Sequence, residues 1–103
     1  MTLKELLKKD FEVELPISGG FGGSIDSPIV IHKAQPNDYV GVEIFVLKCL
    51  GQGRGVKWRM LGQELISHNR KNIDKVKIET EQTTEKEIIT QTENYYFDIT
   101  ECL

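Results

Sequence analysis

Alternating apolar and polar residues recur through most of this chain, and this two-residue period constrains the fold more than any other feature. Val56, Trp58 and Met60 alternate with Lys57 and Arg59. A period of two is that of a β-strand with one face in the core and the other in solvent. Polar turns separate the alternating stretches, so these stretches are predicted to pair as antiparallel neighbours. Similar alternation occurs in residues 11–15, 75–80 and 88–99.

The first ten residues have a different pattern and predict a short helix over residues 2–9, the main helix of the fold. Thr2 and Glu5 have the spacing of a capping box, and Leu3, Leu6 and Leu7 form one apolar stripe. A helix this short is marginal alone, so it is expected to pack on the sheet.

Two further stretches predict strands between this helix and residue 56. Residues 28–32 form a short apolar run, and a turn is expected at residues 34–38. Residues 39–50 are apolar at nearly every position, which is typical of a central strand covered on both faces. A glycine-rich turn is expected at residues 51–55, and Gly62 is expected to introduce a bulge into the following strand.

These elements predict an α+β fold in a single domain spanning residues 1–103. The short N-terminal helix packs on a curved, mainly antiparallel sheet of four to six strands in meander order, which either stays open or forms a half-barrel. A chain of 103 residues suits one domain with one modest core.

Composition excludes several classes of function. The net charge of −3 lacks the excess of positive charge that is typical of nucleic-acid-binding proteins. Residues 48–77 hold eight basic and two acidic residues, whereas residues 78–103 hold seven acidic and one basic, so cross-strand pairing is expected.

No apolar run is long enough to span a membrane, and no signal peptide is found, so a cytoplasmic location is expected. Cys49 and Cys102 are expected to be free thiols, with a disulfide between them as the alternative.

A glycine cluster at residues 19–23 surrounds Phe21. Glycine is needed where φ is positive or where another group approaches the backbone closely, so the loop either bends unusually or is packed upon. No helix follows it, which argues against a phosphate-binding loop. Phe21 either tucks beneath its own loop or stands out as an anchor for a partner.

Few residues have the pattern of a catalytic centre. A serine–histidine–acid set could be assembled from Ser24 or Ser27 with His32 and Asp26, although sequence cannot supply the geometry that such sets require. Glu43 lies within the apolar run at residues 39–50. It is expected to pair with Lys57 or Arg59 on the next strand, and the alternative is a buried acid with a raised pKa.

The leading functional hypothesis is a non-catalytic protein–protein interaction or accessory domain of inhibitor or immunity type, from a bacterium or phage. The alternatives are a small-ligand-binding domain and, third, a small enzyme that uses Glu43 or His32. The expected partner is another protein, and no catalytic residue, cofactor or metal is predicted. The candidate partner surface consists of Gly20, Phe21, Gly22, Arg54, Lys57 and Arg59, and the candidate pocket consists of Glu43, Phe45, Trp58, Tyr95 and Phe97.

Overall fold

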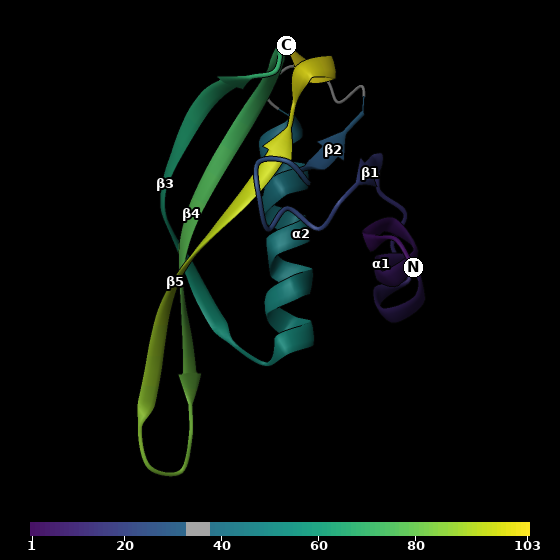
Figure 1. Cartoon of the computed structure of the whole chain (residues 1–103). Helices are drawn as coiled ribbons and strands as arrows, with labels where there is room; N and C mark the ends of the chain where they lie inside the picture. Colours follow the sequence, from purple (N-terminus) through teal and green to yellow (C-terminus); the bar gives the residue numbers. More distant parts are fainter. Residues whose placement is uncertain (33–37) are drawn as a thin grey trace.

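A computed structural model describes residues 1–32 and 38–103. These residues form two α-helices, five strands and a terminal 3-10 helix (Figure 1). Four of the five residues of the turn predicted at 34–38 lie outside the described residues. The elements are α1 (Leu3–Phe11), β1 (Ile17–Gly19), β2 (Ile29–Ile31), α2 (Asp38–Arg54), β3 (Lys57–His68), β4 (Lys71–Thr83), β5 (Ile88–Asp98) and η1 (Thr100–Cys102).

The strands form one open sheet in the order β1-β2-β5-β4-β3. β2 pairs with β5 in parallel, and the other neighbours are antiparallel. The predicted α+β fold with a mainly antiparallel sheet is therefore confirmed, and the sheet does not close into a barrel. β1 and β3 form its two edges. The N-terminal hairpin of β1 and β2 lies on one side of β5, and β4 and β3 lie on the other.

The prediction of a central strand at residues 39–50 is wrong, because this run belongs to α2. Hydrophobicity on every face suits a buried helix as well as a buried strand, and a run of this length favours the helix. Glu43, Val46 and Leu47 are buried. α2 has 17 residues, so it is the main helix in place of α1, and the turn predicted at 51–55 is mostly its last turn.

α1 begins as the sequence predicts. Thr2 and Glu5 form a reciprocal capping box, and Leu3 and Leu7 are buried. The strand predicted at residues 11–15 is absent from the described residues, since Phe11 ends α1 and the first strand starts at Ile17. Both cysteines are free and buried, so the disulfide alternative is wrong. One core joins both helices to the sheet: Leu3, Leu7, Ile17, Ile29, Ile31, Val46, Leu47, Val76, Ile78 and Phe97.

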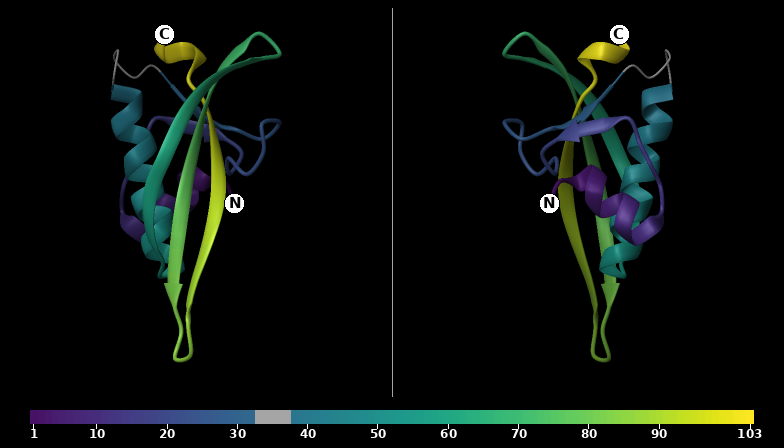
Figure 2. Two further views of the ribbon diagram at one scale, coloured as in Figure 1. Left: turned by 90° about the vertical axis from the view of Figure 1, so that its left-hand side faces the viewer. Right: turned by 90° about the vertical axis from the view of Figure 1, so that its right-hand side faces the viewer.

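β3, β4 and β5 form a long twisted ribbon whose inner face is covered by α2 (Figures 1 and 2). The register shifts between Met60 and Gly62, so the predicted bulge at Gly62 is confirmed. The β4–β5 hairpin continues past the end of α2 as an arm that no other described element covers (Figures 1 and 2). Ile88 is 62% exposed on this arm. None of the helices described is both long and apolar enough to cross a membrane.

The glycine cluster is explained by the backbone. Gly19 and Gly22 have φ values of +84° and +79°, which strain other residues. A Cβ on Gly19 would lie 2.7 Å from the Pro28 carbonyl oxygen. The Tyr96 N–H donates to the Gly22 carbonyl at 2.9 Å, so the loop continues the hydrogen bonding of β5. The loop therefore bends unusually and is also packed upon.

Candidate functional site

A serine, a histidine and a glutamate form a continuous hydrogen-bonded chain at the β1 end of the sheet. Ser18 Oγ lies 2.6 Å from His32 Nε2, and His32 Nδ1 lies 2.6 Å from Glu101 Oε2. A carboxylate only accepts hydrogen bonds, so Nδ1 carries a proton, and in the neutral imidazole Nε2 then accepts from the Ser18 hydroxyl. We call these three residues the Ser18–His32–Glu101 cluster.

The sheet topology brings the three residues together. Ser18 lies opposite Val30 in the β1–β2 register, and His32 follows Val30 by two residues, so the two side chains are diagonal neighbours on one face. β5 runs parallel to β2, with Asp98 beside Val30, and η1 then carries Glu101 up to His32. The His32 and Glu101 side chains are about two-fifths exposed, so solutes can reach them.

This cluster differs from the serine–histidine–acid set that could be assembled from the sequence, and the sequence predicted no catalytic residue. Asp26 lies 3.4 Å from Nε2 of the other histidine, His68, instead of beside His32. His32 instead has Ser18 in place of Ser24 or Ser27, and Glu101 in place of Asp26, as its neighbours. The sequence did not point to Ser18 because a strand was expected before Pro16 and not after it. It did not point to Glu101 because this residue lies 69 positions from His32.

A second cluster of acidic groups is buried between α2 and the sheet. Glu43 has no exposed surface, and Asp74 is also buried. The Gln63 side-chain N–H group donates to Glu43 Oε1 at 3.2 Å and to Asp74 Oδ2 at 2.9 Å. Burial raises the pKa of Glu43 to about 9, and a hydrogen bond to Asp74 adds to this. Glu43 therefore carries a proton at neutral pH, and its Oε2 is buried with no hydrogen-bond partner among the described residues.

The pairing expected between Glu43 and Lys57 or Arg59 is wrong. Glu43 faces Gln63 and Asp74 on the inner face of the sheet, whereas Arg59 lies on the outer face and pairs with Glu79 at 3.1 Å. The difference follows from the helical conformation of residues 39–50, which turns Glu43 toward strands β3 and β4.

Arg54, a candidate partner residue, is paired within the chain. Its two terminal nitrogens donate to Glu93 Oε1 and Oε2 at 2.7 and 2.8 Å. Thr80 Oγ1 also donates to Glu93, at 3.0 Å. The Arg54 hydrogen bonds lower the pKa of Glu93, which stays charged. This network fixes the C-terminal end of α2 against the β4–β5 ribbon.

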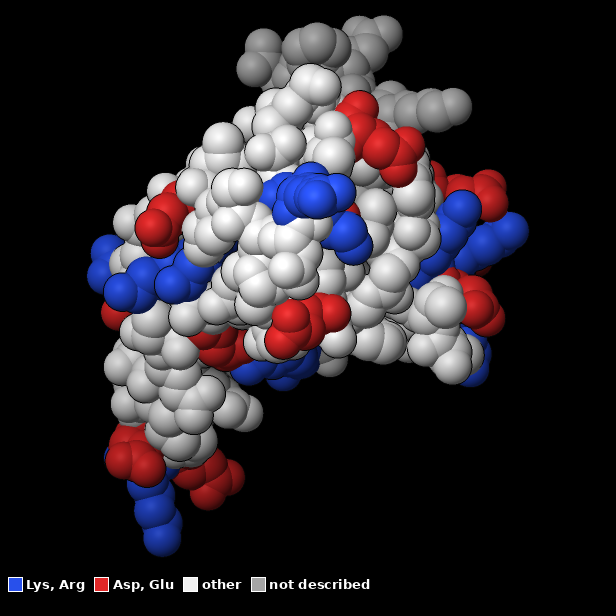
Figure 3. Space-filling view, turned by 45° about the horizontal axis from the view of Figure 1, so that its top comes forward, with Lys and Arg blue, Asp and Glu red and all other residues white. Residues whose placement is uncertain are grey.

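On the outer face of the sheet, one ion pair joins neighbouring strands. Arg59 pairs with Glu79, and in the β3–β4 register Lys57 lies opposite Glu81. On the face shown in Figure 3, basic and acidic side chains are interspersed, and neither sign covers a continuous area.

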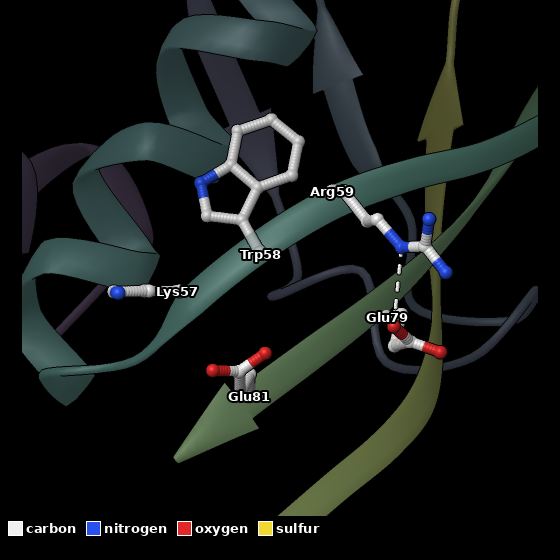
Figure 4. Close-up of a pocket in the computed structure, with 5 residues that line it drawn as sticks. All are labelled: Lys57, Trp58, Arg59, Glu79 and Glu81. Atoms are coloured by element: carbon white, nitrogen blue, oxygen red, sulfur yellow. Dashed lines mark hydrogen bonds and ion pairs between the residues drawn. The ribbon is translucent and has the colours of Figure 1, made fainter. Parts of the chain in front are cut away.

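The five candidate pocket residues have different environments. Phe97 is fully buried, Phe45 is 40% exposed, and Trp58 and Tyr95 are half-buried. A pocket of about 330 Å³ lies beside Trp58, between Lys57, Arg59, Glu79 and Glu81 (Figure 4). Trp58 also lines this pocket but points toward α2, and the other four lining residues are charged. A second pocket, of about 250 Å³, lies over the bulge and is lined by Gly62, Gln63, Glu64, Lys75 and Lys77.

In the candidate partner surface, Phe21 is 50% exposed. The Gly20 N–H donates to the Pro28 carbonyl and the Gly22 N–H to the Ser27 carbonyl, so these two glycines serve the loop itself. Sequence reasoning missed the outer edge of β3, where Leu65 is 61% exposed and Leu61 is also exposed. The sequence offered a signal at Leu61, which adjoins the predicted bulge at Gly62.

Searches of protein-family models, of curated proteins and of solved structures find no match to this chain. No group of three or more histidine, cysteine or acidic residues suited to a metal ion occurs within residues 1–32 and 38–103.

Proposed function

We propose that this chain is a protein–protein interaction module that binds an extended segment of another protein along the outer edge of β3. The main support for this proposal is that β3 is a long strand at the edge of the sheet. β3 has 12 residues, and in the described sheet it pairs only with β4. An edge strand of this length offers a row of free backbone N–H and C=O groups to an incoming strand.

The side chains beside the edge support this choice. Leu65 is exposed on the stretch from Gly62 to His68, and Leu61 is exposed in the bulge beside it, so a segment paired with this stretch would lie against them. The bulge at Met60/Gly62 divides the edge, so the regular pairing surface is the stretch from Gly62 to His68. Lys57 and Arg59 belong to the other stretch, with Glu81 and Glu79 opposite them. The accessory role, of inhibitor or immunity type in a bacterial cytoplasm, belongs to the same proposal.

Affinity capture with matched baits tests this function. The double variant Leu61→Lys/Leu65→Lys places charges along the edge, which disfavours strand pairing. Ile88→Lys places a charge on the hairpin arm, at a position as exposed as Leu65. We expect the wild type and the arm variant to retain one partner from an extract of the source organism, and the edge variant to lose it. Capture of the same proteins by all three baits, or of none, contradicts the proposal.

A further inference from the structure

We propose that the Ser18–His32–Glu101 cluster is a nucleophilic site that hydrolyses small activated esters. It lies at the β1 end of the sheet, and β3 forms the opposite edge, so this inference does not rest on the proposed function. Nucleophilic serines require a base within hydrogen-bond reach and a third group that orients the base. The two distances of 2.6 Å meet both conditions, and each involves the nitrogen that the role requires.

The first step transfers the acyl group to the protein. Ser18 Oγ attacks the ester carbonyl carbon as His32 Nε2 takes the hydroxyl proton. The bond between the acyl carbon and the leaving alcohol then breaks, and His32 returns its proton to that alcohol. Glu101 is a positioning residue, because it fixes the imidazole with Nδ1 protonated and stabilises the positive charge that the ring acquires.

The second step restores the serine. Water attacks the acyl carbon while His32 Nε2 takes its proton, and the bond between that carbon and Ser18 Oγ breaks. His32 gives the proton back to Ser18, and a carboxylic acid leaves. Water is the only co-reactant, and no oxidant, reductant or metal is required.

The backbone beside Ser18 offers a donor for the carbonyl oxygen in the transition state. The His32 N–H donates to the Pro16 carbonyl and the Gly20 N–H to the Pro28 carbonyl, so residues 16, 18 and 20 direct their backbone groups toward β2. Gly19 therefore directs its N–H to the opposite side, the open edge of β1. An N–H on the residue after the nucleophile is a common component of an oxyanion hole.

The surroundings restrict the substrate. The cluster is open to solvent, and Val30 is the apolar residue opposite Ser18. Neither pocket described above includes residues of the cluster. We therefore expect short acyl groups on a good leaving group, for which binding energy matters least, and p-nitrophenyl acetate is the probe.

Covalent labelling tests the nucleophile on the unmodified protein. A fluorophosphonate probe is expected to add to Ser18 and to no other serine, as located by peptide mass spectrometry. Cys49 and Cys102 are buried, so they do not compete for the probe in the folded chain. Labelling spread over several serines, or none at Ser18, overturns the proposal without any variant that must fold.

Hydrolysis of p-nitrophenyl acetate tests the base. His32→Gln is expected to lower the rate by about 100-fold, the usual contribution of a general base. Ser18→Ala is expected to abolish the acyl-protein intermediate. His68→Gln is the matched control, because His68 also lies near a carboxylate, that of Asp26, and should keep the wild-type rate. If Ser18→Ala retains the rate, a histidine reacts directly with the ester and the proposal fails.

Glu101 requires a readout that separates positioning from folding. Glu101→Gln is expected to reduce labelling of Ser18 by roughly tenfold or more, while Glu101→Asp restores part of it because a carboxylate is kept. Thermal melts of both variants show whether the fold is intact. Equal labelling of Ser18 in the wild type and Glu101→Gln overturns the role of Glu101.

Discussion

Gly51 of α2 and Trp58 of β3 lie so close that only a glycine fits at position 51. A Cβ added to Gly51 would lie 2.7 Å from Trp58 Cδ1. The contact fixes the last turns of α2 against the start of β3, on the inner face of the sheet. We predict that Gly51→Ala lowers the free energy of unfolding by about 1 kcal/mol, because overpacking costs more than the gain in helix propensity. Urea denaturation measures the change.

Gly41 provides the matched control for this prediction. It lies in the same helix, and, apart from its chain neighbours and the backbone of α2 itself, no atom of the described residues comes within 4 Å of the position of an added Cβ. Gly41→Ala should therefore stabilise the protein by up to about 1 kcal/mol, through helix propensity alone. If both substitutions change stability in the same direction, the contact between Gly51 and Trp58 is not a constraint.

The buried carboxyl of Glu43 predicts an unusual dependence of stability on pH. Its pKa rises from 4.5 to about 9 on folding, so the folded chain holds a proton that the unfolded chain releases between these values. The free energy of unfolding therefore falls as pH rises through this range, by up to about 1.4 kcal/mol per pH unit. The contribution is fully present below pH 4.5 and is lost as the pH approaches 9.

The substitution Glu43→Gln tests that dependence. A glutamine amide keeps the shape of the protonated acid and a donor for Asp74, but it does not titrate. We expect the variant to lose this slope between about pH 5 and pH 8, as measured by urea denaturation. Glu85→Gln in the exposed hairpin turn is the control and should keep the wild-type slope. A variant with the wild-type slope would mean that other groups cause it.

Local patterns in the sequence predicted the three long strands, the capped N-terminal helix and the bulge, since each depends on neighbours within a few residues. The conformation of residues 39–50 could not be read from hydrophobicity alone, because burial on all sides removes the periodicity that separates helix from strand. The error carried over to Glu43. As a strand residue it was expected to pair with Lys57 or Arg59, and as a helix residue it faces Gln63 and Asp74.

The Ser18–His32–Glu101 cluster depends on contacts between distant parts of the chain. Ser18 and His32 meet across the β1–β2 hairpin, whose first strand lies after Pro16 and not before it. Glu101 arrives through the parallel pairing of β2 with β5. The alternation within a strand does not predict which distant strand it pairs with. Of the three residues, the sequence therefore singled out only His32.

The bidentate pair of Arg54 and Glu93 is expected to contribute more than a surface ion pair. Arg54→Met should lower the free energy of unfolding by about 1 kcal/mol, whereas Arg59→Met, at a more exposed single contact, should cost less than about 0.5 kcal/mol. The Arg54 hydrogen bonds lower the pKa of Glu93 from 4.5. The contribution of Glu93 to the free energy of unfolding is therefore present above about pH 4.5 and is lost as pH falls through its lowered pKa. Equal costs for both variants at neutral pH would contradict the difference.

Phe21 stands in the glycine loop with half of its surface exposed, which favours the exposed alternative over one tucked beneath the loop. Phe21→Ala is therefore predicted to cost less than about 1 kcal/mol, because little apolar surface returns to water. Phe97→Ala is the comparison, since Phe97 is fully buried and its truncation should cost about 3–5 kcal/mol. Thermal melts of both variants measure the contrast. If Phe21→Ala lowers stability as much as Phe97→Ala, the ring of Phe21 lies in the core and cannot anchor a partner. A small loss leaves that role to be decided by binding, where truncation of an anchoring aromatic typically costs about 2 kcal/mol or more.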